Sequence, residues 1–234
     1  MVINMLLGAI IGIVLVLIII ALVYILPMFF MNPLPSGKIE GTEIIAIRNR
    51  SNNLFFVPSG SEWFVIDAGS DPKAVKQEMD RMSIDGQKVK SLFLTHTDYD
   101  HVASISLFPN AAIYMNKQEE QMIDGSICRQ FVKKNKLPQL GSSNKIVWMM
   151  DQDIITLNEH KVRIIWASGH TKGSAMYVVD DKYLFTGDAF RVSKGEILVH
   201  PYTMDRIQAG KTIQSIKEEL GKYTKVFTSH YGIL

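Results

Sequence analysis

The stretch THTDYDH, residues 95–101, decides the fold, because it places two imidazoles and two carboxylates directly after an apolar run. That run, VKSLFL, is apolar enough to be a strand buried on both faces. His96 and Asp98 are two residues apart, so in an extended chain their side chains point the same way. Asp100 and His101 follow where the strand must turn into a helix. Ligands collect at such strand-to-helix turns, so we expect a functional site here.

Three more polar residues follow predicted strands in the second half of the chain. The segments SGHTKGS, FTGDA and FTSHYG place His170, Asp188 and His230 directly after short apolar runs. Imidazole and carboxylate are ligands of zinc and of harder divalent ions. Six side chains are too many for one tetrahedral ion, but with a seventh as a bridge they suit two. Two adjacent ions can share a hydroxide, because coordination lowers the pKa of water from about 15.7 toward about 7.

The remaining pattern predicts alternating strands and helices. Short strands broken by Asn and Gly are expected across residues 42–69. A helix is expected to begin at Asp71 as the N-cap and Pro72 as the first helical residue, and to end before Gly86. Further on, the pattern predicts another helix from Val102, two hairpins over 153–168 and 174–189, and a helix over 205–220. This alternation is typical of proteins with layered α and β elements.

Four motifs in this order, THTDYDH, SGHTKGS, FTGD and TSHYG, resemble those of the metallo-β-lactamase-fold hydrolases, including glyoxalase II-like and lactonase-like members. IDAG, residues 66–69, is similar to an early strand end of the same family. The resemblance covers most of residues 43–232. It implies an α/β fold, the αββα four-layer sandwich, with metal ions at one edge of two facing sheets.

The resemblance also implies a role for each motif residue. His96, Asp98 and His170 would hold the first metal ion. Asp100, His101 and His230 would hold the second metal ion. Asp188 would bridge the two ions. Asp67 would act behind the ligands by orienting a histidine or tightening the turn.

The motif departs from the family at Asp98, where the usual residue is histidine. Aspartate can still bind a metal ion, but it adds a negative charge. We therefore expect a less electrophilic first site. The cofactors would be two divalent ions, Zn²⁺ by default, with Mn²⁺ or Fe²⁺ as alternatives.

The chemistry that follows is hydrolysis of a small molecule. A hydroxide bridging the two ions would attack an ester, thioester, lactone or amide carbonyl, with Asp100 accepting a proton. Arg191, Lys194 and Tyr202 lie in the segment after Asp188 and are candidates to face an anionic substrate. The connection 117–145 is expected either to form a lid over the metals or to cover the edge of the sheet.

Two other functions stay open from the sequence. HxDxDH is also similar to the soluble domain of competence-type DNA-uptake proteins. This similarity suggests a second possible function, that of a phosphodiesterase or nuclease. A formal net charge of +2 and a single tight basic cluster, KKNK at 133–136, argue against nucleic acid. The third function is a non-catalytic module stabilised by metal. The single cysteine, Cys128, excludes a cysteine-built metal site. His160 and His200 are expected to be ordinary surface or core residues, with the alternative that His200, twelve residues after Asp188, reaches the site.

The N-terminal part of the chain predicts a membrane anchor. No charged side chain precedes Lys38, and residues 6–26 are almost wholly aliphatic. As one α-helix they would span roughly 31 Å, the thickness of a bilayer's hydrocarbon core. We therefore expect a transmembrane anchor over 1–31 in contact with lipid through 6–26, a linker over 32–38 and a hydrolase domain over 39–234.

A single-pass membrane localisation follows from this anchor, with the side of the catalytic domain left open. GAIIG, residues 8–12, matches the small-xxx-small pattern that lets membrane helices pack closely. A weak homodimer formed through this motif is therefore a further prediction.

Overall fold

In a computed structural model, the structure describes residues 2–129 and 134–234 of the chain. The chain divides into two compact units, residues 1–31 and residues 32–234. The boundary lies just before NPLPSG, whose two prolines and glycine do not favour a continuing helix.

The N-terminal unit is helical but is not one continuous α-helix. Helix α1 (Val2–Ile20) is followed by a π-helical turn, Ala21–Ile25, and a 3₁₀ turn, Leu26–Phe30. Among the helices of the described residues, none combines the length and the apolar character needed to cross a bilayer. The predicted transmembrane helix is therefore wrong, and so is the single-pass membrane localisation that depended on it. The prediction counted residues 6–26 as one α-helix, whereas the α-helical geometry ends at Ile20.

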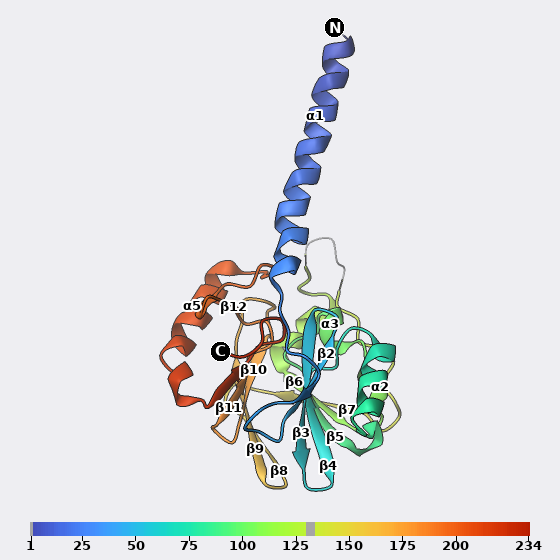
Figure 1. The fold of residues 1–234 in the computed structure, drawn as a ribbon, viewed down its shortest axis with the longest axis vertical. Helices are drawn as coiled ribbons and strands as arrows, with labels where there is room; N and C mark the ends of the chain where they lie inside the picture. The colour runs from blue at the N-terminus through green and yellow to red at the C-terminus, as the bar shows by residue number, and fades with distance from the viewer. Residues whose placement is uncertain (1, 130–133) are drawn as a thin grey trace. The chain divides into compact units, whose positions relative to one another are not determined.

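The second unit contains a seven-stranded mixed sheet whose strands follow one another in chain order (Figure 1). Its strands are β1 (Gly37–Lys38), β2 (Ile45–Asn49), β3 (Asn52–Ser59), β4 (Glu62–Ile66), β5 (Val89–Phe93), β6 (Ala112–Asn116) and β7 (Lys145–Met149). Pairing is antiparallel from β1 to β4 and parallel from β4 to β7. The predicted meander over 42–69 corresponds to β2, β3 and β4.

A five-stranded sheet faces the first one. Its order is β14-β11-β10-β9-β8, from β8 (Ile154–Leu157), β9 (His160–Trp166), β10 (Ala175–Val179), β11 (Tyr183–Phe185) and β14 (Lys225–Phe227). Only the β11–β14 pair is parallel. A separate hairpin, β12 (Arg191–Ser193) and β13 (Glu196–Leu198), leaves this sheet after β11. The two predicted hairpins are β8–β9 and β10–β11.

The helices lie on the outer faces of the two sheets, so the unit has four layers. They are α2 (Pro72–Arg81), α3 (Tyr99–Val102), α4 (Glu120–Asp124) and α5 (Arg206–Lys217). Met79 of α2 packs on the first sheet, whereas Ile216 of α5 packs on the second. Figure 1 shows α2 and α5 on opposite sides of the sheets. The fold class is α/β with two mixed sheets, as predicted for the domain.

Consecutive apolar residues of one strand serve both cores. Phe55 and Phe56 are neighbours in β3, yet Phe55 packs between the sheets and Phe56 packs under the helices. The ring of Phe55 lies 5.3 Å from that of Phe185 in the facing sheet. Because successive side chains of a strand point to opposite faces, a central strand between two packed layers is apolar throughout. This packing fixes the edge at which the strands end.

Two local predictions differ in detail. Asp71 caps α2 by accepting hydrogen bonds from the backbone of Lys73 and Ala74, as predicted, but the helix ends at Arg81, well before Gly86. The helix expected to begin at Val102 is not formed: α3 already ends at Val102, and only a 3₁₀ turn, Ile105–Leu107, follows it. Part of KKNK lies outside the described residues.

Candidate metal centre

Loops at the carboxyl end of the first sheet carry five of the predicted site residues. Asp67 follows β4, and His96 and Asp98 follow β5. Asp100 and His101 lie in α3, which begins directly after Asp98. Asp67 has a positive φ of 60°, which turns the chain sharply after β4.

Loops of the second sheet bring the other three residues to the same place. His170 follows β9, Asp188 follows β11 and His230 follows β14. All three side chains are almost completely buried, and so are His96 and His101. The facing sheets therefore converge on one polar cluster, although its members are spread over 135 residue positions from 96 to 230.

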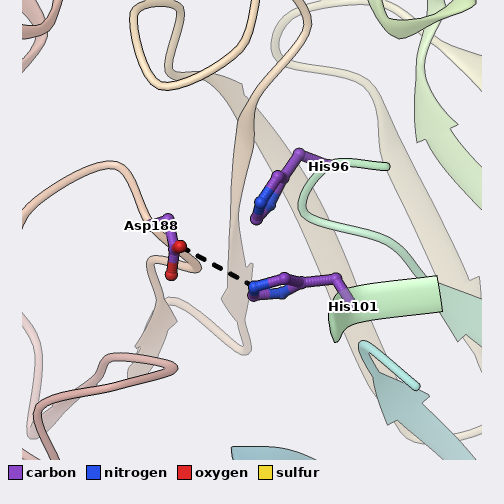
Figure 2. Close-up of side chains that lie close together, drawn as sticks. All are labelled: His96, His101 and Asp188. Atoms are coloured by element: carbon purple, nitrogen blue, oxygen red, sulfur yellow. Dashed lines mark ion pairs between the residues drawn. The ribbon is translucent and has the colours of Figure 1, made fainter. Parts of the chain in front are cut away.

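Asp188 is the centre of this cluster. Its Oδ2 lies 3.2 Å from Nε2 of His230, 3.5 Å from Nε2 of His170 and 3.7 Å from Nε2 of His101. Figure 2 shows the rings of His96 and His101 on one side and the carboxylate of Asp188 opposite them. The ring centroids of His96 and His101 are 4.0 Å apart. Histidines from the loops of both sheets therefore surround the carboxylate of Asp188.

The donor atoms form overlapping groups that fit divalent metal ions. Within each group the ligand atoms lie within 4.8 Å of one another; the groups are His96–His101–Asp188, His96–Asp98–His170, Asp100–His101–His230 and His170–Asp188–His200. A tetrahedral zinc ion with bonds of about 2.1 Å has ligands separated by about 3.4 Å. Asp100 Oδ2 lies 3.4 Å from His230 Nε2 and 3.6 Å from His101 Nε2, close to this value.

Buried atoms without partners also favour a metal ion. Within the described part of the chain, Nε2 of His96, Nε2 of His101 and Oδ1 of Asp188 are buried and make no hydrogen bond. An unsatisfied buried polar atom costs about 1–3 kcal/mol, so several of them facing one space call for a ligand. A divalent ion would satisfy all of them.

Asp67 lies behind the cluster. Its Oδ2 accepts a hydrogen bond from Nδ1 of His101 at 2.8 Å, and its Oδ1 accepts one from the backbone N–H of Thr95 at 2.8 Å. The first contact leaves Nε2 of His101 directed at Asp188 and Asp100. A hydrogen bond to the far nitrogen is the usual way in which proteins orient a metal-binding histidine.

Asp98 makes a contact that the sequence did not predict. Arg129 donates from Nε to Asp98 Oδ1 at 3.0 Å and from Nη2 to Asp98 Oδ2 at 2.5 Å. Asn135 donates to Oδ1 at 3.1 Å. The carboxylate still lies 3.2 Å from Nε2 of His170 and 3.5 Å from Nε2 of His96. Asp98 is thus in the cluster, but an arginine fork already holds both of its oxygens.

Burial and charge set the protonation states of the cluster. Burial lowers the pKa of His170 to about 4, only partly offset by the hydrogen bond with Asp98. Burial also lowers the pKa of His101, but the charges of Asp67, Asp100 and Asp188 outweigh it and hold that pKa well above its usual value. The pKa of His230 is raised in the same way, because Asp188 outweighs the effect of burial.

The pKa of Asp188 itself lies well below its usual value. Burial raises it, but the charges of His230, His200 and His101 have the larger combined effect. Without metal, the cluster is therefore a carboxylate surrounded by imidazoles, of which His101 and His230 hold protons most strongly. A metal ion that binds His101 or His230 would therefore compete with a proton.

Glu119 is a further buried carboxylate near the cluster, and sequence reasoning missed it. Its Oε1 accepts hydrogen bonds from the backbone N–H and the hydroxyl of Thr97, at 2.8 and 2.7 Å. Its Oε2 accepts from the hydroxyl of Thr171 at 2.7 Å and from the backbone N–H of Gly173 at 3.1 Å. Glu119 therefore joins the loop of His96 to the loop of His170.

His200 lies in the cluster, contrary to the expectation that it is an ordinary residue. It is buried, and its Nε2 lies 3.7 Å from Asp188 Oδ2. Its ring centroid is 4.9 Å from that of His170. His160, by contrast, lies outside the cluster and donates from Nδ1 to Asp180 at 2.6 Å. His200 follows the β12–β13 hairpin on an irregular segment, where no strand-end pattern marks it.

Tyr231 is the other functional candidate that the sequence did not indicate. Its ring lies 5.8 Å from that of His200, and its hydroxyl is buried with no hydrogen-bond partner in the described chain. Burial, and next the charge of Asp188, raise the pKa of Tyr231 well above its usual value. The hydroxyl therefore keeps its proton and can donate it to a ligand.

The three predicted substrate-facing residues separate in the structure. The Tyr202 ring lies 5.6 Å from that of His200, and its carbonyl oxygen accepts a hydrogen bond from Arg129. Arg191 begins β12 and is close enough to lower the pKa of Tyr231 by its charge. Lys194 is exposed at the turn of the hairpin, with a positive φ of 53°. Tyr202 and Arg191 are thus beside the cluster, whereas Lys194 is at the tip of its flanking hairpin.

Comparison with known proteins agrees with this geometry. The sequence model of the metallo-beta-lactamase superfamily matches residues 47–230, the span that contains all seven predicted ligands. A probable metallo-hydrolase of Bacillus subtilis, YybB, is 25% identical over 179 residues, which cover 72% of this chain and 77% of the relative.

Two further relatives match over shorter stretches. A hydroxyacylglutathione hydrolase of Glaesserella parasuis is 27% identical over 148 residues, 60% of this chain and 50% of the relative. A probable polyketide biosynthesis zinc-dependent hydrolase of B. subtilis, PksB, is 25% identical over 146 residues, 61% of this chain and 57% of the relative. The chain thus spans about half the length of these two relatives.

A solved structure shows the same fold. BJP-1, a subclass B3 metallo-beta-lactamase of Bradyrhizobium japonicum, superposes with a TM-score of 0.65 over 86% of this chain and 79% of that protein. The sequence identity is 13%, so the likeness concerns the fold and not the substrate.

Proposed function

The chain belongs to the metallo-beta-lactamase superfamily, a class of metal-dependent hydrolases, and we propose that it hydrolyses a small carboxylic acid derivative with two metal ions. The observation that carries this proposal is the convergence of imidazoles on one buried carboxylate. Asp188 Oδ2 lies within 3.7 Å of a histidine Nε2 from four different segments of the chain. Two ligand groups on either side of one shared carboxylate support a binuclear centre.

Zinc is the proposed metal. The donor set is imidazole and carboxylate, which zinc accepts readily, and one relative is named as a zinc-dependent hydrolase. When bound, divalent ions would lower the pKa of water and polarise the substrate carbonyl. The second ion would be held by Asp100, His101 and His230, and Asp188 would be shared.

The chain's own side chains supply the remaining steps. The Asp100 carboxylate is partly exposed beside His230, where it can accept a proton from the attacking water and pass it to the leaving group. The Tyr231 hydroxyl is buried, protonated and without a partner in the described chain, so it can donate a hydrogen bond to the substrate oxygen on which charge develops.

The preferred substrate class is a thioester or ester with an anionic group. Support comes from the relative named hydroxyacylglutathione hydrolase and from Arg191, whose charge acts on Tyr231 and lowers its pKa. The guanidinium of an arginine can pair with a substrate carboxylate through two parallel hydrogen bonds.

The test is a substrate screen with the full-length chain loaded with Zn²⁺. Thioesters, esters, lactones, amides, bis(aryl) phosphate and DNA would be compared by kcat/KM. The proposal predicts turnover of thioester or ester substrates at least about a hundred-fold above the phosphodiesters, a difference of about 2.7 kcal/mol in transition-state binding. Turnover of phosphodiesters or DNA alone would refute the proposal and favour a phosphodiesterase or nuclease. No turnover at full metal occupancy would replace it with the non-catalytic, metal-stabilised module.

A further inference from the structure

Asp98 is already neutralised by a cation of the chain itself. The Arg129 guanidinium contacts both carboxylate oxygens, at 3.0 Å and 2.5 Å, and Asn135 contacts Oδ1 as well. The side chains of Arg129 and Asp98 are only 19% and 17% exposed, so this pair is not a loose surface contact. A two-pronged arginine–carboxylate pair is among the strongest ion pairs in proteins. A metal ion that used Asp98 would have to compete with it.

His200, unlike Asp98, is buried without a hydrogen-bond partner among the described residues. Its side chain is 1% exposed, and both ring nitrogens lack a hydrogen-bond partner in the part of the chain that the structure describes. A buried imidazole with two unsatisfied nitrogens is costly unless a ligand completes it. Its nearest acidic neighbour is Asp188, at 3.7 Å from Nε2.

The distances around His200 suit a metal ion. His170 Nε2 and His200 Nε2 lie 3.5 Å and 3.7 Å from Asp188 Oδ2. These values are near the ligand separation of about 3.4 Å in a tetrahedral zinc site. Nε2 of His96 is also buried and unpartnered among the described residues, and His96 groups with His101 and Asp188 and, separately, with Asp98 and His170.

We propose that His200, and not Asp98, completes the first metal site together with His96, His170 and Asp188, while Asp98 serves as the fixed partner of Arg129. This inference rests on the metal centre of the proposed function and assigns its ligands differently from the sequence prediction. The third imidazole of the first site then comes from the segment after the β12–β13 hairpin instead of from the THTDYDH motif.

Arg129 can accommodate such an ion without leaving Asp98. Its Nη2 lies 2.9 Å from Nε2 of His170 and 3.3 Å from the His170 carbonyl oxygen. When the imidazole binds an ion, the same N–H can donate to that carbonyl oxygen, and the contacts with Asp98 are kept.

The assignment also changes the charge of the centre. With Asp98 paired to Arg129, the ions face two carboxylates, Asp100 and Asp188, and not three. The positive charge of Arg129 therefore cancels the negative charge that Asp98 would add to the metal centre. The first site regains three imidazoles, so it should be as electrophilic as a site with a histidine in the motif.

The experiment compares two ligands by metal content. The full-length chain and its variants His200→Gln, His200→Phe and Asp98→Asn would be loaded with Zn²⁺ or Co²⁺, and bound metal would be counted by mass spectrometry after gel filtration. X-ray absorption of the cobalt forms would count the imidazoles per ion. His160→Gln is the matched control, because it removes a histidine outside the cluster.

We expect two ions in the parent chain, the control and Asp98→Asn, and one tightly held ion in both His200 variants, with a Kd for the other ion raised at least tenfold. The average number of imidazoles per cobalt should fall only in the His200 variants. Thermal unfolding of the metal-free His200→Phe chain should be no earlier than in the parent, because an unsatisfied polar group is removed.

Other outcomes overturn the inference. If the Asp98→Asn variant binds one ion fewer than the parent, Asp98 is a metal ligand, whether or not the His200 variants also lose an ion. Two ions with an unchanged imidazole count in both His200 variants exclude His200. A parent chain that binds no ion refutes the proposed function itself, which distinguishes the two failures.

Discussion

Asp67 accepts a hydrogen bond at 2.8 Å from the Nδ1 of His101, a residue that follows it by more than thirty positions. This contact keeps a proton on Nδ1 of His101. Because Nδ1 donates to the carboxylate, Nε2 is the nitrogen that faces Asp188 and Asp100. The orientation of a ligand is therefore set from outside the cluster.

Replacing Asp67 by asparagine should weaken metal binding without removing a ligand. The amide is uncharged and no longer favours the tautomer with a proton on Nδ1, so we expect a metal affinity about 10–100-fold lower, as for other partners of metal-bound histidines. Chelator competition measures it. Asp180→Asn is the control, because it breaks a similar pair with His160 outside the cluster. Equal affinities in the two variants would exclude the orienting role of Asp67.

Removal of the central carboxylate should have the largest effect. In Asp188→Asn, the histidines of both proposed sites lose the one charge that they share. We expect loss of at least one ion and a fall in kcat/KM of about a thousand-fold or more, equivalent to about 4 kcal/mol. Metal analysis and turnover of the best substrate measure this. Asp181→Asn is the control, since that side chain is 83% exposed. Near-normal metal content and turnover would remove Asp188 from the centre.

The positions of the motif residues could be predicted because each follows a strand. A buried strand is visible as an apolar run, and strand ends meet at one sheet edge, so His170, Asp188 and His230 could be expected to converge. His200 follows no such run. Its position depends on how the β12–β13 hairpin folds back, and a short irregular segment gives no periodic signal for that.

Contacts across long loops were also invisible in the sequence. Arg129 and Glu119 both lie in the connection between β6 and β7, which was expected only as a lid or an edge cover. Whether an arginine in such a segment meets Asp98 depends on tertiary packing and not on spacing. The N-terminal error has a related cause, because hydropathy gives the length of an apolar run but not the residue at which α-helical geometry ends.

Glu119 should matter for stability more than for the chemical step. Glu119→Ala leaves the donors of Thr97, Thr171 and Gly173 buried without an acceptor, so we expect the free energy of unfolding to fall by about 3 kcal/mol or more. Glu119→Gln keeps one acceptor and should lose less, about 1–2 kcal/mol. Urea unfolding of the metal-free chain measures both. A loss below about 0.5 kcal/mol in the alanine variant would contradict the role of Glu119 as a link between the two loops.

The contribution of Glu119 to the free energy of unfolding should also depend on pH, in a direction that its pKa determines. Burial raises the pKa of Glu119 above the ordinary value of 4.5, so the folded state binds its proton more tightly than the unfolded state. Its contribution to stability is then present below pH 4.5 and is lost as the pH rises through the raised pKa of the folded state. Glu119→Gln has no such proton, so the difference in stability between parent and variant should change in this window. A constant difference would contradict it.

Metal binding should release protons, and this is the most direct test of the electrostatics of the cluster. The neighbouring carboxylates overcome burial and raise the pKa of His101 and of His230, so the metal-free chain holds protons there at pH values where an ordinary histidine has lost them. An ion must displace these protons, so its apparent affinity should fall as the pH falls below the raised pKa values, by about tenfold per pH unit for each proton displaced. Calorimetry in two buffers of different ionisation enthalpy counts the protons. His230→Gln should release about one proton fewer than the parent. Binding that is independent of pH, with no proton released, would show that the imidazoles are already neutral and that the carboxylates do not control them.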